Sequence, residues 1–272
     1  TFIEAYAIKA REMLKDTEDY SQTEIHNLEL IAHRMERIAH KTPRTFIEGL
    51  NLVFLVNCAL HQTGEPMSIG RMDQFMYNLY KNDKENDGVS EDKFQEALDS
   101  FWLKMDETVL YNYNHLNDYL NYGTGAVFYS AGNFPQGAAI NQWVQQLTVG
   151  GVVANDSQKP IDASNELTKM CLRSSRRLPL NAPCLSLRVH KDMSDDLFEE
   201  AAKAMLSGGG HPILLNDDKL VPALHACGPL SLADARDYTC DGCYEPIIPG
   251  KTEWAFSYVP ILPYVGMAMN QG

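Results

Sequence analysis

The sequence predicts an α/β protein, in which a helix-rich N-terminal third is followed by parallel strands that alternate with helices. Two observations support this fold class. In the first third, apolar residues recur at the three-to-four-residue spacing of amphipathic helices. From Gln146 onward, short apolar or β-branched runs alternate with segments of helix length. Such alternation is typical of parallel strands with helices packed outside them, in a barrel or in an open sheet.

Helix signals fill the first third of the chain. Ser21 and Glu24 form a capping box, whose hydroxyl and carboxylate satisfy free amides at a helix start. Pro43 is expected to end that helix and to precede another, whose apolar face runs from Phe46 to Phe54. Ser90 is expected to cap a further helix with acidic residues in its first turn.

The strand–helix alternation gives specific expectations for the rest of the chain. Strands are expected at Leu147–Val149, Leu185–Val189 and Ile213–Leu215, and helices at 162–178 and 194–207. No internal repeat, low-complexity tract or linker interrupts the chain, so we treat residues 1–272 as one domain section.

Composition excludes several classes of function. The chain has 272 residues, 44% of them hydrophobic and 22% charged, with a formal net charge of −13. An acidic surface repels the phosphate backbone, so we expect no nucleic-acid partner. No apolar run reaches the ~20 residues of a membrane helix, and no secretory leader pattern is seen. Six dispersed cysteines in a chain of this length suggest reduced thiols and a cytoplasmic protein.

The densest cluster of reactive residue types runs from Cys240 to Pro246. Gly242 permits the backbone angles of a tight loop that presents one side chain. Cys243 and Glu245 alternate along an extended segment, so both could face one cavity. A thiol beside a carboxylate can pair a group that takes hydrogen with one that moves protons.

Taken alone, this cluster has three interpretations. The first is a redox pair formed by Cys240 and Cys243. The second is a zinc site formed by His225, Cys227, Cys240 and Cys243, since imidazole and thiolate are zinc ligands. The third is buried cysteines that pack as small apolar side chains, with Glu245 in solvent. The residues themselves leave all three open.

Three further groups of residues have ordinary structural interpretations. Gly208–Gly210 lacks the lysine of a phosphate-binding loop, so a turn between helix and strand is expected. Arg71 and Asp73 could form an internal ion pair that caps a helix. Asn216 and Asp217 are of the residue types that begin helices.

Several segments, read in order along nearly the whole chain, resemble sequence motifs of the glycyl radical enzymes, the pyruvate formate-lyase-like family. The quoted family patterns are P-R-T-F-x-E, S-x-G-R-x-D-Q, T-x-G-G, D-A-T-N-E-L, G-x-G-x-P…N-D and A-R-x-Y…G-C-V-E-P. The corresponding segments are Thr42–Glu48, Met67–Gln74, Leu147–Gly151, Asp162–Leu167, Gly208–Asp217 and Ala235–Pro246. Ser164 replaces the threonine and Tyr244 the valine of these patterns.

The resemblance implies a ten-stranded α/β barrel, of which residues 1–272 would be the central section of a pyruvate formate-lyase-like domain. It also implies that a glycyl radical, installed by a separate iron–sulfur activase that uses S-adenosylmethionine, oxidises Cys243 to a thiyl radical. That radical would abstract hydrogen from the substrate. The family's R-V-x-G-Y segment is not found here. We therefore expect the C-terminal glycyl radical domain to be absent, no cofactor to be bound, and this section to be inactive alone.

The resemblance also narrows the subgroup. Formate acetyltransferases of the family carry two adjacent cysteines, whereas Gly242 precedes Cys243 here. The loop is similar to that of the eliminating members, the diol dehydratases, choline lyase and sulfonate lyases. In those enzymes the loop glutamate, here Glu245, is the base. Glycerol-type dehydratases have His and Ser where this chain has Glu65 and Pro66. We therefore expect Glu65 to bind a cationic or donor-rich substrate.

The partners implied by the resemblance are a small-molecule substrate, the radical-activating enzyme, the remainder of the same enzyme and a second copy in a homodimer. No membrane partner is expected. The rival hypothesis from a different class is a non-catalytic metal-binding or redox module that uses His225, Cys227, Cys240 and Cys243. The substrate and its leaving group stay open.

Overall fold

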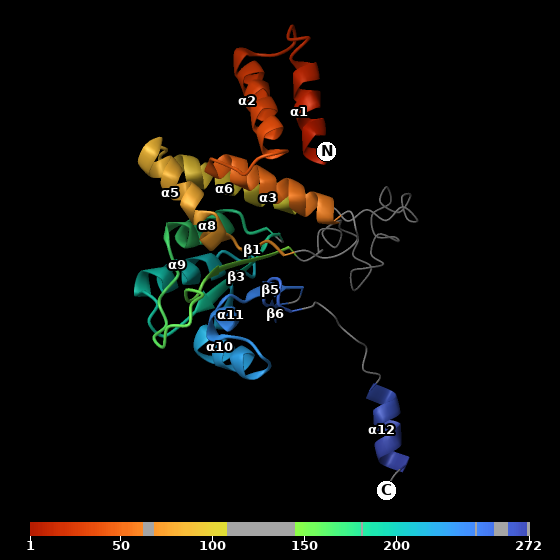
Figure 1. Cartoon of the computed structure of the whole chain (residues 1–272), viewed down its shortest axis with the longest axis vertical. Coiled ribbons are helices and arrows are strands. Elements are labelled where there is room, and N and C mark those ends of the chain that lie inside the picture. Colours follow the sequence, from red (N-terminus) through yellow and green to blue (C-terminus); the bar gives the residue numbers. More distant parts are fainter. Residues whose placement is uncertain (62–67, 108–144, 181, 243, 253–260, 271–272) are drawn as a thin grey trace.

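The computed structural model describes residues 1–61, 68–107, 145–180, 182–242, 244–252 and 261–270 (Figure 1). Helices dominate the first third, as predicted. They are α1 (Phe2–Met13), α2 (Gln22–Ile38), α3 (Phe46–His61), α4 (Met72–Phe75), α5 (Tyr77–Asn86) and α6 (Glu91–Asp106). The later helices are α8 (Glu166–Arg177), α9 (Asp195–Met205), α10 (Asp217–Ala226), α11 (Leu232–Arg236) and α12 (Ile261–Asn270).

The capping signals read from the sequence are partly confirmed. Ser21 and Glu24 form the expected capping box at the start of α2. Ser90 precedes α6, as expected, but its side chain makes no capping hydrogen bond. Helix α2 ends at Ile38, before Pro43, so the proline itself does not end the helix. Arg37 Nη2 donates to the Thr42 carbonyl at 3.1 Å in the segment that follows.

Four parallel strands form the main sheet in the order β1-β2-β3-β4. Their bounds are β1 (Gly70–Arg71), β2 (Gln146–Gly150), β3 (Cys184–Val189) and β4 (Ile213–Asn216). Helix α8 connects β2 to β3, and α9 connects β3 to β4. The three expected strands and both expected helices are therefore confirmed. Strand β1 was not predicted, because two residues are too few for a periodic pattern.

One face of this sheet is apolar and covered by helices. Side chains alternate between the faces of a strand, and the odd-numbered residues of β2 and β3 point to this face. Leu147, Val149, Leu185 and Leu187 are buried there in the main core, with apolar side chains from α3 to α6, α8 and α9. This core is the largest of the three in the described part of the chain.

The opposite face of the same strands is polar, yet it is equally buried. It consists of Gln146, Thr148, Ser186 and Arg188, each with 0% exposure. An antiparallel hairpin made of β5 (Thr239–Asp241) and β6 (Glu245–Ile247) lies against it, with β5 in contact with β1 and β2. In Figure 1 this hairpin lies on the side of α10 and α11, away from the N-terminal helices.

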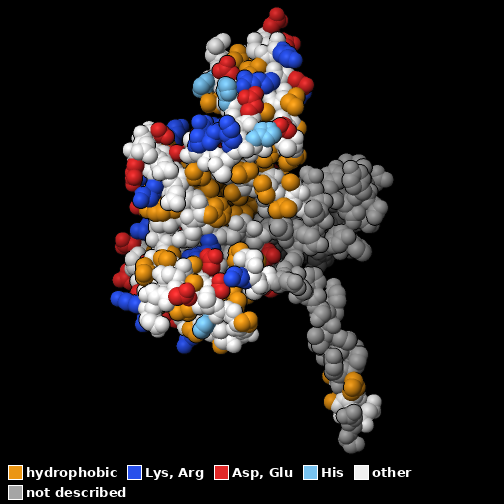
Figure 2. Space-filling model, in the orientation of Figure 1, with side chains coloured by type: hydrophobic (Ala, Val, Ile, Leu, Met, Phe, Trp, Pro, Cys, Tyr) orange, Lys and Arg blue, Asp and Glu red, His pale blue; other side chains and the backbone are white. Residues whose placement is uncertain are grey.

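The N-terminal pair α1–α2 shares a small core with α3, formed by Ala7, Met35, Ile38 and Leu55. Below this pair, Figure 2 shows hydrophobic side chains gathered over the region of α3. An open groove of about 650 Å³ runs beside α3 and is lined by apolar residues such as Leu50 and by basic residues such as Arg34. In the ranges that the structure describes, no helix is long and apolar enough to span a membrane.

Candidate active site

The β5–β6 hairpin carries the cluster singled out in the sequence, and polar side chains of the main sheet hold it in place. Thr148 Oγ1 accepts hydrogen bonds from Thr239 Oγ1 at 2.8 Å and from the Cys240 amide at 3.1 Å. Gln146 Nε2 donates to the Gly242 carbonyl at 3.2 Å. Ser68 Oγ donates to the carboxylate of Asp241, the last residue of β5. The hairpin is thus fastened from its first strand to its tip.

The turn of the hairpin has an uncommon backbone. Gly242 has φ 49° and Tyr244 has φ 81°. Positive φ is uncommon for a residue other than glycine, and it persists only where the surroundings hold it. Cys243, which lies between them, is outside the described residues, and so is Glu65. The predicted roles of these two residues therefore stay predictions.

Glu245 is the member of the predicted site that the structure describes. It begins β6, pairs with Asp241 across the hairpin and has an exposed side chain. The expectation that its side chain shares one side of an extended segment with Cys243 does not fit the backbone, because Tyr244, between them, has a positive φ. Its role as a base stays a prediction.

The zinc interpretation finds no support among the described residues. Within those ranges, no three His, Cys, Asp or Glu side chains are grouped so that they could hold a metal ion. His225 and Cys227 are exposed at the end of α10, where His225 Nδ1 donates to the Leu230 carbonyl at 2.7 Å. Cys240 is instead fully buried in the small core beneath the hairpin. Burial raises the pKa of its thiol to about 12, so the group is protonated and inert at neutral pH.

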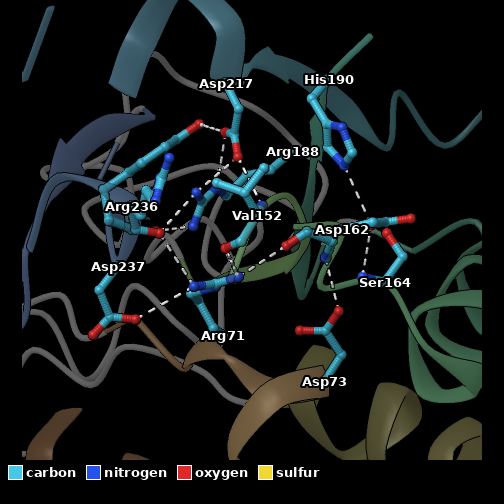
Figure 3. Close-up of polar contacts among 12 residues, drawn as sticks. Arg71, Asp73, Val152, Asp162, Ser164, Arg188, His190, Asp217, Arg236 and Asp237 are labelled. Carbon is cyan, nitrogen blue, oxygen red and sulfur yellow. Dashed lines mark hydrogen bonds and ion pairs between the residues drawn. The ribbon is translucent and has the colours of Figure 1, made fainter. Parts of the chain in front are cut away.

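A buried ion pair lies at the base of the hairpin (Figure 3). Arg188 Nε and Nη2 donate to the two oxygens of Asp217 at 2.9 and 2.8 Å. Arg188 also donates to the carbonyls of Tyr238 at 2.8 Å and Arg236 at 2.9 Å, and its guanidinium stacks 3.9 Å from the Tyr238 ring centroid. Asp217 therefore compensates the charge of Arg188, and all three guanidinium nitrogens donate hydrogen bonds. A buried arginine requires both.

Asp217 completes this arrangement. Besides the two hydrogen bonds from Arg188, it accepts one from Tyr238 Oη at 2.7 Å and one from the Val152 amide at 3.0 Å. Asn216 does occupy the N-cap position of α10, as expected, but its side chain makes no capping hydrogen bond. The conspicuous role of the Asn216–Asp217 pair is thus the ion pair and not the helix cap.

Arg71 is a second buried arginine at the same place. Its Nη2 donates to the carbonyls of Gly150 at 3.1 Å and Val152 at 3.0 Å, and its Nη1 donates to the Arg236 carbonyl at 3.2 Å. The expected ion pair between Arg71 and Asp73 is wrong. Arg71 reaches the exposed Asp237 instead, at 3.3 Å. The two arginines together hold the backbone that leads into β5.

Asp73 has a separate structural role on the helix side of the sheet. It is fully buried and accepts hydrogen bonds from the Gly150 amide at 2.7 Å and from Thr168 Oγ1 at 2.6 Å. Burial raises the pKa of this carboxyl, and its hydrogen bonds with Gly150 and Thr168 offset only part of that rise. Asp73 therefore links α4 to the end of β2 and to the first turn of α8.

The paired glycines after β2 make room for the ion pair. Gly150 and Gly151 have φ 73° and 78°, which favour glycine. A Cβ at Gly151 would lie 2.6 Å from Arg188 Nε and 2.7 Å from Asp217 Oδ2. In the turn Gly208–Gly210 between α9 and β4, the two positive-φ glycines, Gly208 and Gly210, face open space, whereas a Cβ at Gly209 would lie 3.0 Å from Pro179 Cα. The segment forms the expected turn between helix and strand.

Sequence reasoning missed the polar face that supports the hairpin. The strand pattern alone does not identify this face, which consists of Gln146, Thr148, Ser186 and Arg188. The available signal was their spacing of two, which places polar residues on one face of adjacent strands. The register confirms this, because Gln146 lies beside Cys184, and Thr148 beside Ser186.

Comparisons with known proteins agree with this architecture. A model of the family described as Pyruvate formate lyase-like matches residues 1–272. The chain is 32% identical over 257 residues to the probable dehydratase YbiW of Escherichia coli, covering 93% of this chain and 29% of that protein. It is 29% identical over 277 residues to isethionate sulfite-lyase of Desulfovibrio desulfuricans, covering 98% and 30%.

A solved structure shows the same likeness in three dimensions. The crystal structure of a glycyl radical enzyme from Archaeoglobus fulgidus matches with a TM-score of 0.72 and 27% identity, covering 91% of this chain and 29% of that one. The chain therefore spans about three tenths of the length of these relatives.

Proposed function

Because this chain belongs to the pyruvate formate lyase-like family and shares the α/β fold of the glycyl radical enzymes, we propose that it is the central catalytic section of a glycyl radical lyase. In this proposal Cys243 carries the thiyl radical and Glu245 is the base. The reaction is the elimination of a hydroxyl or another heteroatom group from a small molecule. The relatives named as a dehydratase and a sulfite-lyase support this reaction class.

The observation that carries the proposal is the anchoring of the β5–β6 hairpin on the buried polar face of the sheet. The turn contains residue 243 between Gly242 and Tyr244, both with positive φ, and Gln146 holds the carbonyl of Gly242. Backbone strain that the surroundings maintain is characteristic of functional sites. A group that abstracts hydrogen needs a fixed position, because the reaction rate falls steeply when the reacting atoms are displaced.

The proposed reaction begins at Cys243. Its thiyl sulfur takes a hydrogen atom from a substrate carbon, so that an S–H bond forms and a carbon radical remains. Glu245 accepts the proton of the adjacent hydroxyl, and the neighbouring group leaves with its electron pair. The product radical then recovers the hydrogen atom from Cys243. Glu245 begins the strand after the turn, a position that suits a group acting on the same substrate.

The radical itself would come from outside this section. We propose that the remainder of the enzyme supplies the radical glycine and that a separate activase, using S-adenosylmethionine, generates it. This chain matches only about three tenths of the length of its relatives, which supports a longer enzyme whose other part carries the glycine. We further propose that Glu65 contacts the substrate and that the enzyme acts in the cytoplasm as a homodimer.

The test uses the full-length enzyme, activated anaerobically, with glycerol, 1,2-propanediol, choline and isethionate as probes. The glycyl radical is quantified by electron spin resonance, and products are measured for each variant. Cys243→Ser should abolish turnover, because an alcohol O–H bond is too strong to replace the thiol. Glu245→Gln should keep the radical signal but slow elimination about 10²- to 10⁴-fold, as expected for a lost general base.

Matched variants make these results specific. Cys227→Ser changes an exposed cysteine and should leave turnover intact. Glu65→Gln should raise KM if Glu65 accepts a hydrogen bond from the substrate, and unchanged kinetics would remove it from the site. A Cys243→Ser enzyme that still turns over would refute the radical mechanism.

A further inference from the structure

The side chain of Gln146 connects the main sheet directly to the tip of the hairpin. It is buried, with 0% exposure, and both ends of its amide are used. Its Nε2 donates to the Gly242 carbonyl at 3.2 Å, and its Oε1 accepts a hydrogen bond from Ser186 Oγ at 3.1 Å. Ser186 lies on β3, the next strand of the sheet. Two strands therefore contribute to one contact on the turn.

We propose that Gln146 is a positioning residue for the reaction, with Ser186 as the group that holds the other end of its amide. The inference rests on the proposed function, because it assumes that the hairpin presents the reacting thiol. The Gly242 carbonyl belongs to the planar peptide unit that joins residues 242 and 243. A hydrogen bond to that carbonyl fixes the orientation of the unit and so restricts where residue 243 can lie.

Gly242 and Ser186 hold the two ends of the Gln146 amide. A glutamine amide has one accepting and one donating end, and a carbonyl can only accept. The Gly242 carbonyl therefore selects the NH₂ end, because a flipped amide would place two oxygens against each other. The Ser186 hydroxyl can donate or accept, and here it donates to Oε1, which holds the other end of the amide in place.

The neighbouring residue provides a matched control for the contribution of Gln146 to stability. Gln145 is also buried, with 1% exposure, and its Nε2 also donates to a backbone carbonyl, that of Met105, at 3.1 Å. Met105 belongs to α6, on the helix-covered side of the sheet. The same substitution at positions 145 and 146 thus removes a hydrogen bond to a backbone carbonyl from similar burial. At position 146 it also removes the bond from Ser186, and only that position contacts the hairpin.

The experiment compares Gln146→Met with Gln145→Met in the activated full-length enzyme. Methionine has a similar length and makes no such hydrogen bond. We expect both variants to form the glycyl radical and to lower Tm, Gln146→Met by the larger amount because it also loses the bond from Ser186. Gln146→Met should lower kcat per radical about 10- to 100-fold with little change in KM, because ångström-scale misplacement of a reacting group has effects of this size. Gln145→Met should keep kcat per radical within about twofold of the unmodified enzyme.

A second variant keeps the inference testable if Gln146→Met folds poorly. Ser186→Ala removes the hydroxyl that holds Oε1 of Gln146 but keeps the bond to Gly242. It should lower kcat per radical by a smaller factor than Gln146→Met does. The inference would be overturned if Gln146→Met or Ser186→Ala kept the kcat per radical of the unmodified enzyme. It would also be overturned if Gln146→Met and Gln145→Met lost kcat per radical equally. These outcomes differ from failure of the proposed function, which would appear as turnover by Cys243→Ser.

Discussion

Replacing Asp217 with asparagine should strongly destabilise the protein, because it breaks the buried ion pair with Arg188. The substitution hardly changes the shape of the side chain, so packing is preserved. It removes the negative charge that compensates Arg188, and both side chains are at least 98% buried. Breaking a buried pair on one side leaves an uncompensated charge, which costs about 3–5 kcal/mol.

The hydrogen bonds at Asp217 give a similar magnitude. Its two oxygens accept four hydrogen bonds, from Arg188 Nε, Arg188 Nη2, Tyr238 Oη and the Val152 amide. The single oxygen of asparagine can keep two of these, and its NH₂ group would face donors at the other two. Hydrogen bonds to charged groups contribute about 1.5–3 kcal/mol each, so two lost bonds account for at least 3 kcal/mol.

The assay is urea unfolding of the unactivated protein, with Asp218→Asn as the control. Asp218 is the adjacent residue, is exposed and accepts one hydrogen bond, from the Lys191 amide at 2.8 Å. A loss of 3 kcal/mol or more should lower the urea midpoint of Asp217→Asn by about 1 M or more. Asp218→Asn should cost about 1 kcal/mol or less. Equal midpoints for the two variants would refute the assigned contribution of the ion pair.

Two further predictions follow from the same region. Gly151→Ala should destabilise by about 2–5 kcal/mol, from left-handed strain and from overpacking against Arg188 and Asp217. Gly88→Ala, at φ 64° with no atom within 4 Å of the added Cβ, should show the strain alone, about 1–2 kcal/mol, and similar losses for both would contradict the close-packing argument. Iodoacetamide at pH 8 should modify the exposed Cys227 and spare Cys240 until the protein unfolds, because the raised pKa of Cys240 (about 12) leaves almost no thiolate. Mass spectrometry of native and urea-treated protein measures this, and equal rates in the native state would contradict the burial of Cys240.

The regular part of the fold was predictable because its signals are local. The strand at Leu185–Val189 and the helix that follows Ser194 each bury one side, and periodicity records which residues do so. Strands β1, β5 and β6 have two or three residues each. Strand β1 pairs with β2 in the main sheet, and the β5–β6 hairpin packs against that sheet, so all three depend on tertiary contacts. No local pattern encodes so short a strand.

The support of the candidate site could not be predicted for a different reason. Arg188 and Asp217 are 29 residues apart, and each has an ordinary local interpretation as a strand residue and a helix start. Their pairing depends on β3 and the start of α10 meeting in space, which a single sequence does not report. The motif around Cys243 was visible because its residues are adjacent, whereas the side chains that hold it come from β1, β2 and β3.

The anchors of the hairpin bind mainly to atoms that every amino acid carries. Arg71 and Arg188 contact carbonyls at positions 236 and 238, Thr148 accepts from the amide at 240, and Gln146 donates to the carbonyl at 242. These hydrogen bonds therefore depend little on the identity of the side chains of the hairpin. A substitution at the exposed Glu245 thus removes none of these backbone anchors. For the same reason, a loss of turnover in Glu245→Gln would report the loss of the carboxylate and not of the support beneath it.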